Sequence, residues 1–148
     1  DEPGVASNIY TGSPIAFSSA DTTVTTILSR SIDPPGSDSG YVMVVGTLQF
    51  MFQNPPEVAA YALFGVSMTA GQFSSYGTYE ANAPAAESVN SYWETVTVQG
   101  VFRVGPNADT FYLLAKRLSG GGFEIGRAAL TLIYLPTAYG TVTEFPEP

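Results

Sequence analysis

The chain has 148 residues, and 45% of them are hydrophobic, which is enough for a single domain with a buried core. Charged residues make up 12% of the chain, about half the usual share, and the net charge is −8 at pH 7. Nucleic acids and anionic membrane surfaces are bound through clustered cations, so this charge balance argues against both classes of partner. No apolar run approaches the length needed to span a bilayer.

Two residue types that carry much enzyme chemistry are missing, because the chain has no cysteine and no histidine. This rules out disulfides, Ser-His-Asp and Cys-His catalytic sites, and the usual zinc and copper sites. A two-carboxylate site stays formally open, but Glu80, Glu87 and Glu94 are spread across loop and strand and share no face. A Ser-Lys pair would need Lys116, and nothing marks its serine. We therefore predict a protein that is not an enzyme and has no cofactor.

Residues 1–20 form no clear element, and we predict an arm there. Pro3 and Pro14 exclude a central strand, because proline cannot donate to the hydrogen-bond ladder. The sparse apolar residues of this arm, set at near-alternating positions, are Val5, Ile9, Ile15 and Phe17. Such an arm packs along its own domain or lies on a neighbouring copy, and the residues alone do not decide between the two.

Long segments of β-branched and aromatic residues, separated by turn signals, predict strands and no helix of normal length. The predicted strands cover residues 22–32, 40–53, 58–69, 91–105, 111–118 and 123–135. The strongest turn signal is the Ser-Gly-Gly-Gly run at 119–122. Glycine reaches positive φ without steric cost, as a tight turn requires, so we predict that the last two strands pair as a hairpin.

Alternation with a period of two predicts which side chains face the core. The core-like sets are Val24, Thr26, Leu28 and Ile32 in the first strand, Val42, Val44, Leu48, Phe50 and Phe52 in the second, and Tyr92, Glu94, Val96, Val98, Phe102 and Val104 in the fourth. The opposite face of the second strand carries Tyr41, Met43 and Val45. That face is therefore not cleanly polar.

The longest irregular stretch lies between the third and fourth strands and is rich in aromatic residues. Together with the two rings that follow it, the candidate binding residues are Phe73, Tyr76, Tyr79, Tyr92 and Trp93. Loops carry function more often than strands, and exposed rings suit contact with a sugar or a protein. The alternative is that the rings of the loop plug one end of the domain, since aromatic side chains are usually buried.

The loop at residues 33–40 brings together Asp33, Ser37, Asp38 and Ser39. Clustered oxygens suit a hard cation, so this loop could hold calcium. Asp, Ser, Pro and Gly also form ordinary turns, and this is the interpretation that we favour. No metal site is predicted.

These elements predict an all-β protein, specifically an antiparallel β-sandwich of the jelly-roll type. We divide the chain into an N-terminal arm at 1–20, the β-sandwich domain at 21–137 and a C-terminal tail at 138–148. The tail contains a short strand candidate at 141–145.

Three segments resemble strands of the tumour-necrosis-factor and complement-globular-head superfamily, above all of its bacterial members. They are Gly40–Val44 with Phe50 further on, Thr110–Leu113 before a glycine turn, and Ala129–Leu135. The match covers about residues 20–136 and lacks the full aromatic signature and the collagen-like stalk of that superfamily. The resemblance implies a compact homotrimer with a recognition or structural role. The face at Tyr41, Met43 and Val45 could supply its trimer core.

Low charge, a β-sandwich core and the lack of catalytic groups predict a structural subunit of an extracellular homo-oligomeric assembly, such as a surface fibre, appendage or coat. A terminal arm could link copies by pairing with an exposed sheet edge, because edge strands carry unpaired backbone groups. The arm residues are Val5, Ile9, Ile15, Phe17, Val142 and Phe145. Head-to-tail contacts of this kind make open filaments, and a homotrimer is the other expected assembly.

The alternative function is an extracellular recognition module that binds carbohydrate or protein through the aromatic residues named above. Asn82, Asn90 and Glu94 would then orient sugar hydroxyls. The chain begins with Asp1 and not with Met, so we expect a mature protein outside the cell or at the cell surface after removal of a signal peptide.

Overall fold

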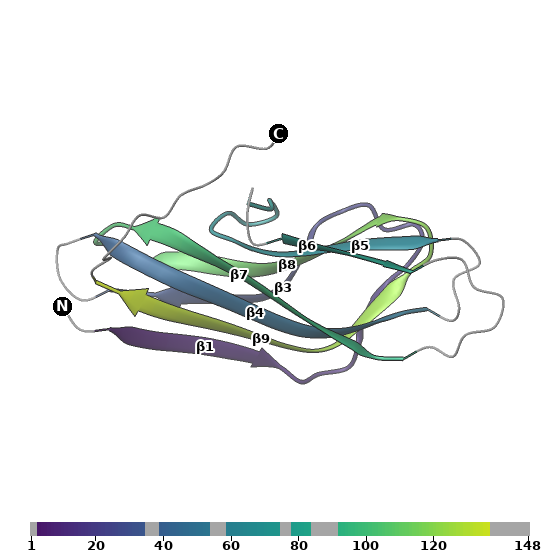
Figure 1. Ribbon diagram of the computed structural model, residues 1–148, viewed down its shortest axis with the longest axis horizontal. Coiled ribbons are helices and arrows are strands. Elements are labelled where there is room, and N and C mark those ends of the chain that lie inside the picture. Colours follow the sequence, from purple (N-terminus) through teal and green to yellow (C-terminus); the bar gives the residue numbers. More distant parts are fainter. Residues whose placement is uncertain (1–2, 35–38, 54–58, 75–77, 84–91, 137–148) are drawn as a thin grey trace.

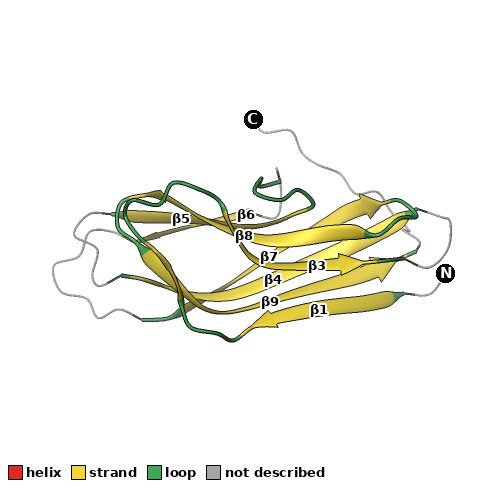
Figure 2. Ribbon diagram, turned by 180° about the vertical axis from the view of Figure 1, so that it is seen from behind, coloured by secondary structure: helices red, strands yellow, loops and turns green. Residues whose placement is uncertain are grey.

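Strands alone make up the regular structure of the computed structural model, which describes residues 3–34, 39–53, 59–74, 78–83 and 92–136 (Figure 1). They are β1 (Gly4–Tyr10), β2 (Ile15–Phe17), β3 (Thr25–Ile32), β4 (Gly40–Phe52), β5 (Ala60–Ser67), β6 (Thr78–Ala83), β7 (Glu94–Val104), β8 (Asp109–Ser119) and β9 (Phe123–Leu135). Within these residues no helix is formed, and hence none that is long and apolar enough to cross a membrane (Figure 2). The predicted all-β class is confirmed.

The strands form two antiparallel sheets that pack face to face. Sheet A has the order β1-β9-β4-β7, with the short β2 also on β9, and sheet B has the order β3-β8-β5-β6. In Figure 1, β1, β9, β4 and β7 run side by side, with the strands of sheet B against their other face. Each sheet therefore has an inner face in the core and an outer face.

The pairing of the strands is nested, first with last and then inward along the chain. β1 pairs with β9, β3 with β8, β4 with β7, and β5 with β6. The contacts of β9 with β4 and of β8 with β5 join these pairs into the two sheets. This is the arrangement of a jelly roll, which confirms the predicted fold class.

The glycine run between β8 and β9 does not close a hairpin, so that prediction was wrong. β8 lies in sheet B and β9 in sheet A, and the connection crosses from one sheet to the other. Gly120 has a φ of +78°, and a Cβ on it would collide with the carbonyl oxygen of Ala59. Glycine is required at this position because two backbone segments approach each other closely at the end of the sandwich, which leaves no room for a Cβ.

The N-terminal segment is part of sheet A, and the expectation of no clear element in residues 1–20 was wrong. β1 pairs with the second half of β9 and β2 with its beginning. β1 ends the strand order of its sheet, which agrees with the exclusion of a central strand by the flanking prolines. Its alternation is weak because only Ala6 and Tyr10 pack against the core, while Val5 and Ile9 are exposed.

Aromatic rings from both sheets meet in the core. Phe17 stacks on Phe123 with ring centroids 4.3 Å apart, and Phe64 of sheet B meets Phe123 edge-on at 5.6 Å. Phe50 lies 5.0 Å from Phe64. Such pairs add to the free energy gained from burying the rings, typically by about 1 kcal/mol each.

The alternation predicted for β4 is confirmed, since Val42, Val44, Leu48, Phe50 and Phe52 are all buried. In β7, the four apolar members of the predicted set are buried: Val96, Val98, Phe102 and Val104.

Four positions depart from the predicted core, and one of them is Val24, which is half-buried directly before β3. Tyr92 is 63% exposed and Glu94 half-buried, because they stand where β7 begins, at the end of the sandwich. In β3 a register shift between Thr26 and Leu28 turns Ile27 inward, so Thr26 is exposed.

Candidate interface on the outer face of sheet A

The register of sheet A aligns side chains of four strands in rows across its outer face. One row is apolar from edge to edge: Val5 on β1 faces Ile133 on β9, which faces Met43 on β4, which faces Val101 on β7. Val5 is 70% exposed and the other three are half-buried. Nothing among the described residues covers Val5, although it is a branched apolar side chain.

The next two rows are uncharged as well. They consist of Ser7, Thr131, Val45 and Gln99, and of Ile9, Ala129, Thr47 and Thr97. The hydroxyls of Thr47 and Thr97 share a hydrogen bond of 3.3 Å across the strands. We call these three rows the uncharged patch. Its two ends are marked by cations, Arg103 opposite Tyr41 and Arg127 opposite Gln49.

The outer face of sheet B has a different character. Glu80 on β6 and Lys116 on β8 both flank Leu63 of β5, so charges stand in the middle of that face. At the β3 side, the hydroxyls of Ser31 and Thr110 hydrogen-bond at 2.6 Å. The lack of charge in the uncharged patch is therefore not a general property of the surface.

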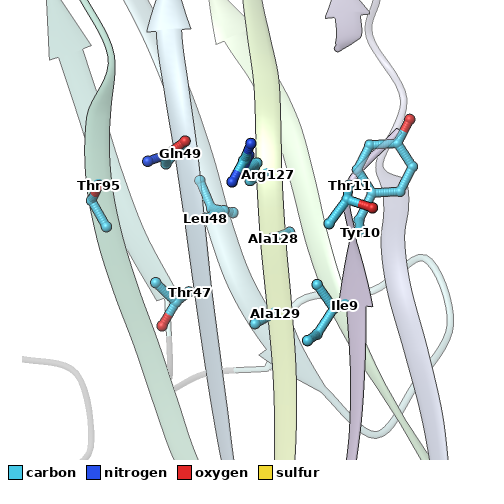
Figure 3. A pocket seen from close by; sticks show the side chains of 10 residues that line it. All are labelled: Ile9, Tyr10, Thr11, Thr47, Leu48, Gln49, Thr95, Arg127, Ala128 and Ala129. Atoms are coloured by element: carbon cyan, nitrogen blue, oxygen red, sulfur yellow. The ribbon is translucent and has the colours of Figure 1, made fainter. Parts of the chain in front are cut away.

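Sheet A is hollowed at the end of the uncharged patch that is nearer to Arg127 (Figure 3). The hollow has a volume of about 280 Å³. Its lining includes Ile9 of β1, Thr11 directly after β1, Gln49 of β4, Thr95 of β7, and Arg127 and Ala129 of β9. A register shift between Gln49 and Phe50 leaves an extra residue in β9 next to the hollow, and such a bulge bends its strand.

Arg127 is the cation of this hollow. Its side chain is exposed, and no hydrogen bond or ion pair joins its guanidinium to another described residue. In the register it lies opposite Gln49, which lies opposite Thr95, so an amide and a hydroxyl extend the polar row across three strands. Glu124, the carboxylate on the same strand, is three residues away beyond the extra residue. The hollow can therefore accept an anionic group.

Trp93 borders the same region. Its six-membered ring lies over Gly126, the residue before Arg127, and a Cβ on that glycine would be 3.0 Å from two ring carbons. The ring is still 44% exposed. The candidate binding residue Trp93 thus has a ring that rests on sheet A with one part open to solvent.

The other predicted aromatic residues come from different elements. Phe73 is half-buried in the segment after β5, and Tyr79, on β6 of sheet B, is 49% exposed. Tyr92 lies next to Trp93 at the start of β7, and Tyr76 is outside the described residues. Within the part of the chain that the structure describes, no ring-to-ring contact joins these aromatic residues into one cluster.

The predicted arm residues also separate. Val5 and Ile9 are exposed and belong to the uncharged patch, and Ile15 is half-buried against the core. Phe17 is 2% exposed and stacked on Phe123 of its own chain, which corrects its assignment to an arm that reaches a neighbour. Val142 and Phe145 lie outside the described residues.

The candidate calcium loop is described only at its ends. Asp33 and Ser39 are exposed, and Ser37 and Asp38 are outside the described residues. Among the residues that are described, no group of three or more Asp or Glu side chains could hold a metal ion.

Sequence reasoning found two β4 residues of the uncharged patch, Met43 and Val45, together with Tyr41 at its end, but missed Val101 and Ile133. Alternation in the last strand would have put Ile133 on the face opposite Leu132. Only the strand order shows that the outer faces of β4, β7 and β9 are continuous.

No family model and no curated protein matches the sequence. Among solved structures, a chain of infectious bursal disease virus, Gx strain, is similar in fold with a TM-score of 0.41 and 14% identity. The similarity covers 95% of this chain and 38% of that one. A chain of T=1 particles derived from infectious bursal virus has a TM-score of 0.31 and 12% identity, over 91% of this chain and 40% of that one.

The chain thus spans about two fifths of the length of the two viral chains. Likeness at these scores says nothing about the function of this chain. The jelly-roll topology agrees with the fold implied by the resemblance to the tumour-necrosis-factor and complement-globular-head superfamily. Membership of that superfamily stays a prediction.

Proposed function

We propose that this protein is a non-enzymatic structural subunit that assembles with copies of itself through the outer face of sheet A. The observation that carries the proposal is the uncharged patch, which extends across all four strands in a chain of net charge −8. The core of a protein interface is depleted in charged residues, and such a patch marks an interaction site. A surface fibre, appendage or coat outside the cell is the setting that we propose for the assembly.

Self-association explains why a strongly acidic protein keeps the uncharged patch free of carboxylates. Like charges brought together across an interface repel one another, and a buried unpaired carboxylate carries a large desolvation penalty. The patch avoids both effects, while its apolar row of Val5, Met43 and Ile133 supplies the gain from burial.

The test is to place a carboxylate in the apolar row. Met43→Glu and Val5→Glu are expected to convert the assembly to monomer, measured by sedimentation velocity and light scattering over a range of concentrations. The matched control is Asn82→Glu, which adds the same charge at an exposed position of sheet B. Native assembly in both patch variants, or a native chain that stays monomeric at high concentration, would contradict the proposal.

Recognition of carbohydrate is the second candidate function, and the exposed ring of Trp93 beside Arg127 favours it. A sugar ring would stack on the indole and place a hydroxyl or carboxylate against the amide of Gln49. A glycan array that binds the native chain but not Trp93→Ala would support this function. An array that stays blank for both would count against it.

A further inference from the structure

The uncharged patch is too small to hold two copies together without a further contact. Strands lie about 4.8 Å apart and rise about 3.4 Å per residue, so even the part of sheet A between residues 127 and 135, which includes the rows of Arg127 and Arg103 at the two ends of the patch, measures roughly 400 Å². Stable interfaces bury about 800 Å² on each partner. If the proposed assembly holds, a second contact must supply the rest.

The hollow next to the patch has the chemistry for such a contact. Ile9 and Ala129 provide an apolar wall, and Arg127, Gln49 and Thr95 provide a polar rim (Figure 3). A guanidinium with no described partner binds a carboxylate through paired N–H donors. The group that fits is therefore a carboxylate with an apolar side chain directly beside it.

The cations elsewhere are less suited to this role. Arg117 is engaged, since its Nε donates to the carbonyl of Asp21 at 2.8 Å and its Nη1 to that of Gly120 at 3.1 Å. Lys116 lies on sheet B, and Arg103 stands at the opposite end of the patch, outside the hollow. Only Arg127 combines a cation with a hollow on the proposed interface face of the described chain.

The chain itself contains a segment with the required pattern. Residues 141–147 read Thr-Val-Thr-Glu-Phe-Pro-Glu, which places Glu144 beside Phe145 and a second carboxylate at Glu147. Proline favours an extended backbone and disfavours helix at the residue before it. We propose that the hollow at Arg127 receives the 141–147 segment of a second copy, an inference that rests on the proposed self-assembly.

The distance along the chain indicates that the segment in the hollow comes from a second copy and not from the same chain. Arg127 lies eight residues back along β9 from Leu135, which is about 27 Å. Glu144 lies nine residues beyond Leu135, a span of at most about 32 Å when fully extended. Within one chain the segment would need to reverse direction and stay almost straight, whereas a neighbouring copy has no such restriction.

Charge reversal in the full-length chain tests the pairing. Arg127→Glu is expected to weaken association about tenfold or more, because the hollow would then repel the acidic segment. The chain carrying Glu144→Arg with Glu147→Arg is expected to weaken equally. An equimolar mixture of the two variants should regain assembly, because each hollow then meets a segment of opposite charge on the other variant. Arg103→Glu is the matched control and should associate more strongly than Arg127→Glu.

A direct binding measurement separates this inference from the proposed function. A synthetic peptide of residues 138–148 is titrated into the full-length chain, with Trp93 as the fluorescent reporter beside the hollow. We expect saturable binding that Arg127→Gln removes and Arg103→Gln retains. No binding to the native chain would overturn the inference, while loss of assembly in Met43→Glu would still support the proposed function.

Two further results would also overturn the inference. A mixture of the two charge-reversed variants that stays dissociated would show that the segment does not pair between copies. An acidic oligosaccharide that binds at Arg127 while the peptide does not would assign the hollow to recognition and not to assembly.

Discussion

Trp93 packs its ring on Gly126, two strands away across the outer face of sheet A. Trp93 directly precedes β7, Gly126 lies in β9, and β4 runs between these strands. The absence of a side chain at Gly126 is what lets the ring reach this far. Gly126 directly precedes Arg127, so the contact places the indole next to the part of β9 that carries this cation.

Gly126→Ala is expected to push the Trp93 ring outward, because the added Cβ would be 3.0 Å from two of its carbons. The ring is 44% exposed and can move, so the free energy of unfolding should fall by only about 1 kcal/mol. Tryptophan emission should shift to longer wavelength as the ring becomes more hydrated. Gly105→Ala is the control, since a Cβ there meets no atom within 4 Å and should leave the emission unchanged.

Gly120→Ala and Gly71→Ala separate two effects of a glycine. Both residues have positive φ, +78° and +70°, but only at Gly120 would a Cβ collide with the backbone of Ala59. Gly71→Ala should lower the free energy of unfolding by about 1 to 2 kcal/mol, the cost of the left-handed conformation. Gly120→Ala should lower it by about 3 kcal/mol or more, because the collision adds to that cost. Urea unfolding of both variants measures the difference, and equal losses would contradict the close approach of the two backbone segments.

The hydroxyl of Tyr134 is expected to destabilise the fold. Tyr134 is 1% exposed, and its hydroxyl has no hydrogen-bond partner among the described residues. Tyr134→Phe should raise the free energy of unfolding by about 1 kcal/mol, because a buried group without a partner is removed.

The hydroxyl of Tyr10 provides the opposite case, because it donates to the carbonyl of Ser13. Tyr10→Phe should lower the free energy of unfolding by about 1 kcal/mol. Thermal unfolding of the two variants side by side tests the sign. A loss of stability in Tyr134→Phe would mean that its hydroxyl has a partner.

Arg117 ties the segment after β2 to the turn after β8. Its guanidinium donates to the carbonyls of Asp21 and Gly120. Arg117→Met keeps the apolar stem and removes both bonds, so the free energy of unfolding should fall by about 2 kcal/mol. Arg30→Met, at an exposed position of β3, is the control and should change it by less than about 0.5 kcal/mol. Equal effects in the two variants would argue against the anchoring role of Arg117.

The strands and their buried faces could be predicted from the sequence alone, because they follow from local alternation. Val42, Val44 and Leu48 are two or four residues apart, and in any extended strand they must share a face. The same reasoning placed Met43 and Val45 on the opposite face, and in this way it found a part of the candidate interface. It failed for Phe17, whose short segment is too weakly patterned to indicate that its ring is in the core.

The pairing of strands was decided by the tertiary structure. Two strands joined by a connection from one sheet to the other have the same alternating pattern as two strands of a hairpin, and both connections can use the same glycines. Residues 119–122 could therefore not show that β8 and β9 belong to different sheets. Which strand lies beside β4 depends on contacts between residues far apart in the sequence. The sequence by itself thus determined an all-β chain with one semi-apolar outer face on β4. Only the packing of the two sheets aligned Val5, Ile133, Met43 and Val101 in a row and brought Arg127 to the edge of the patch.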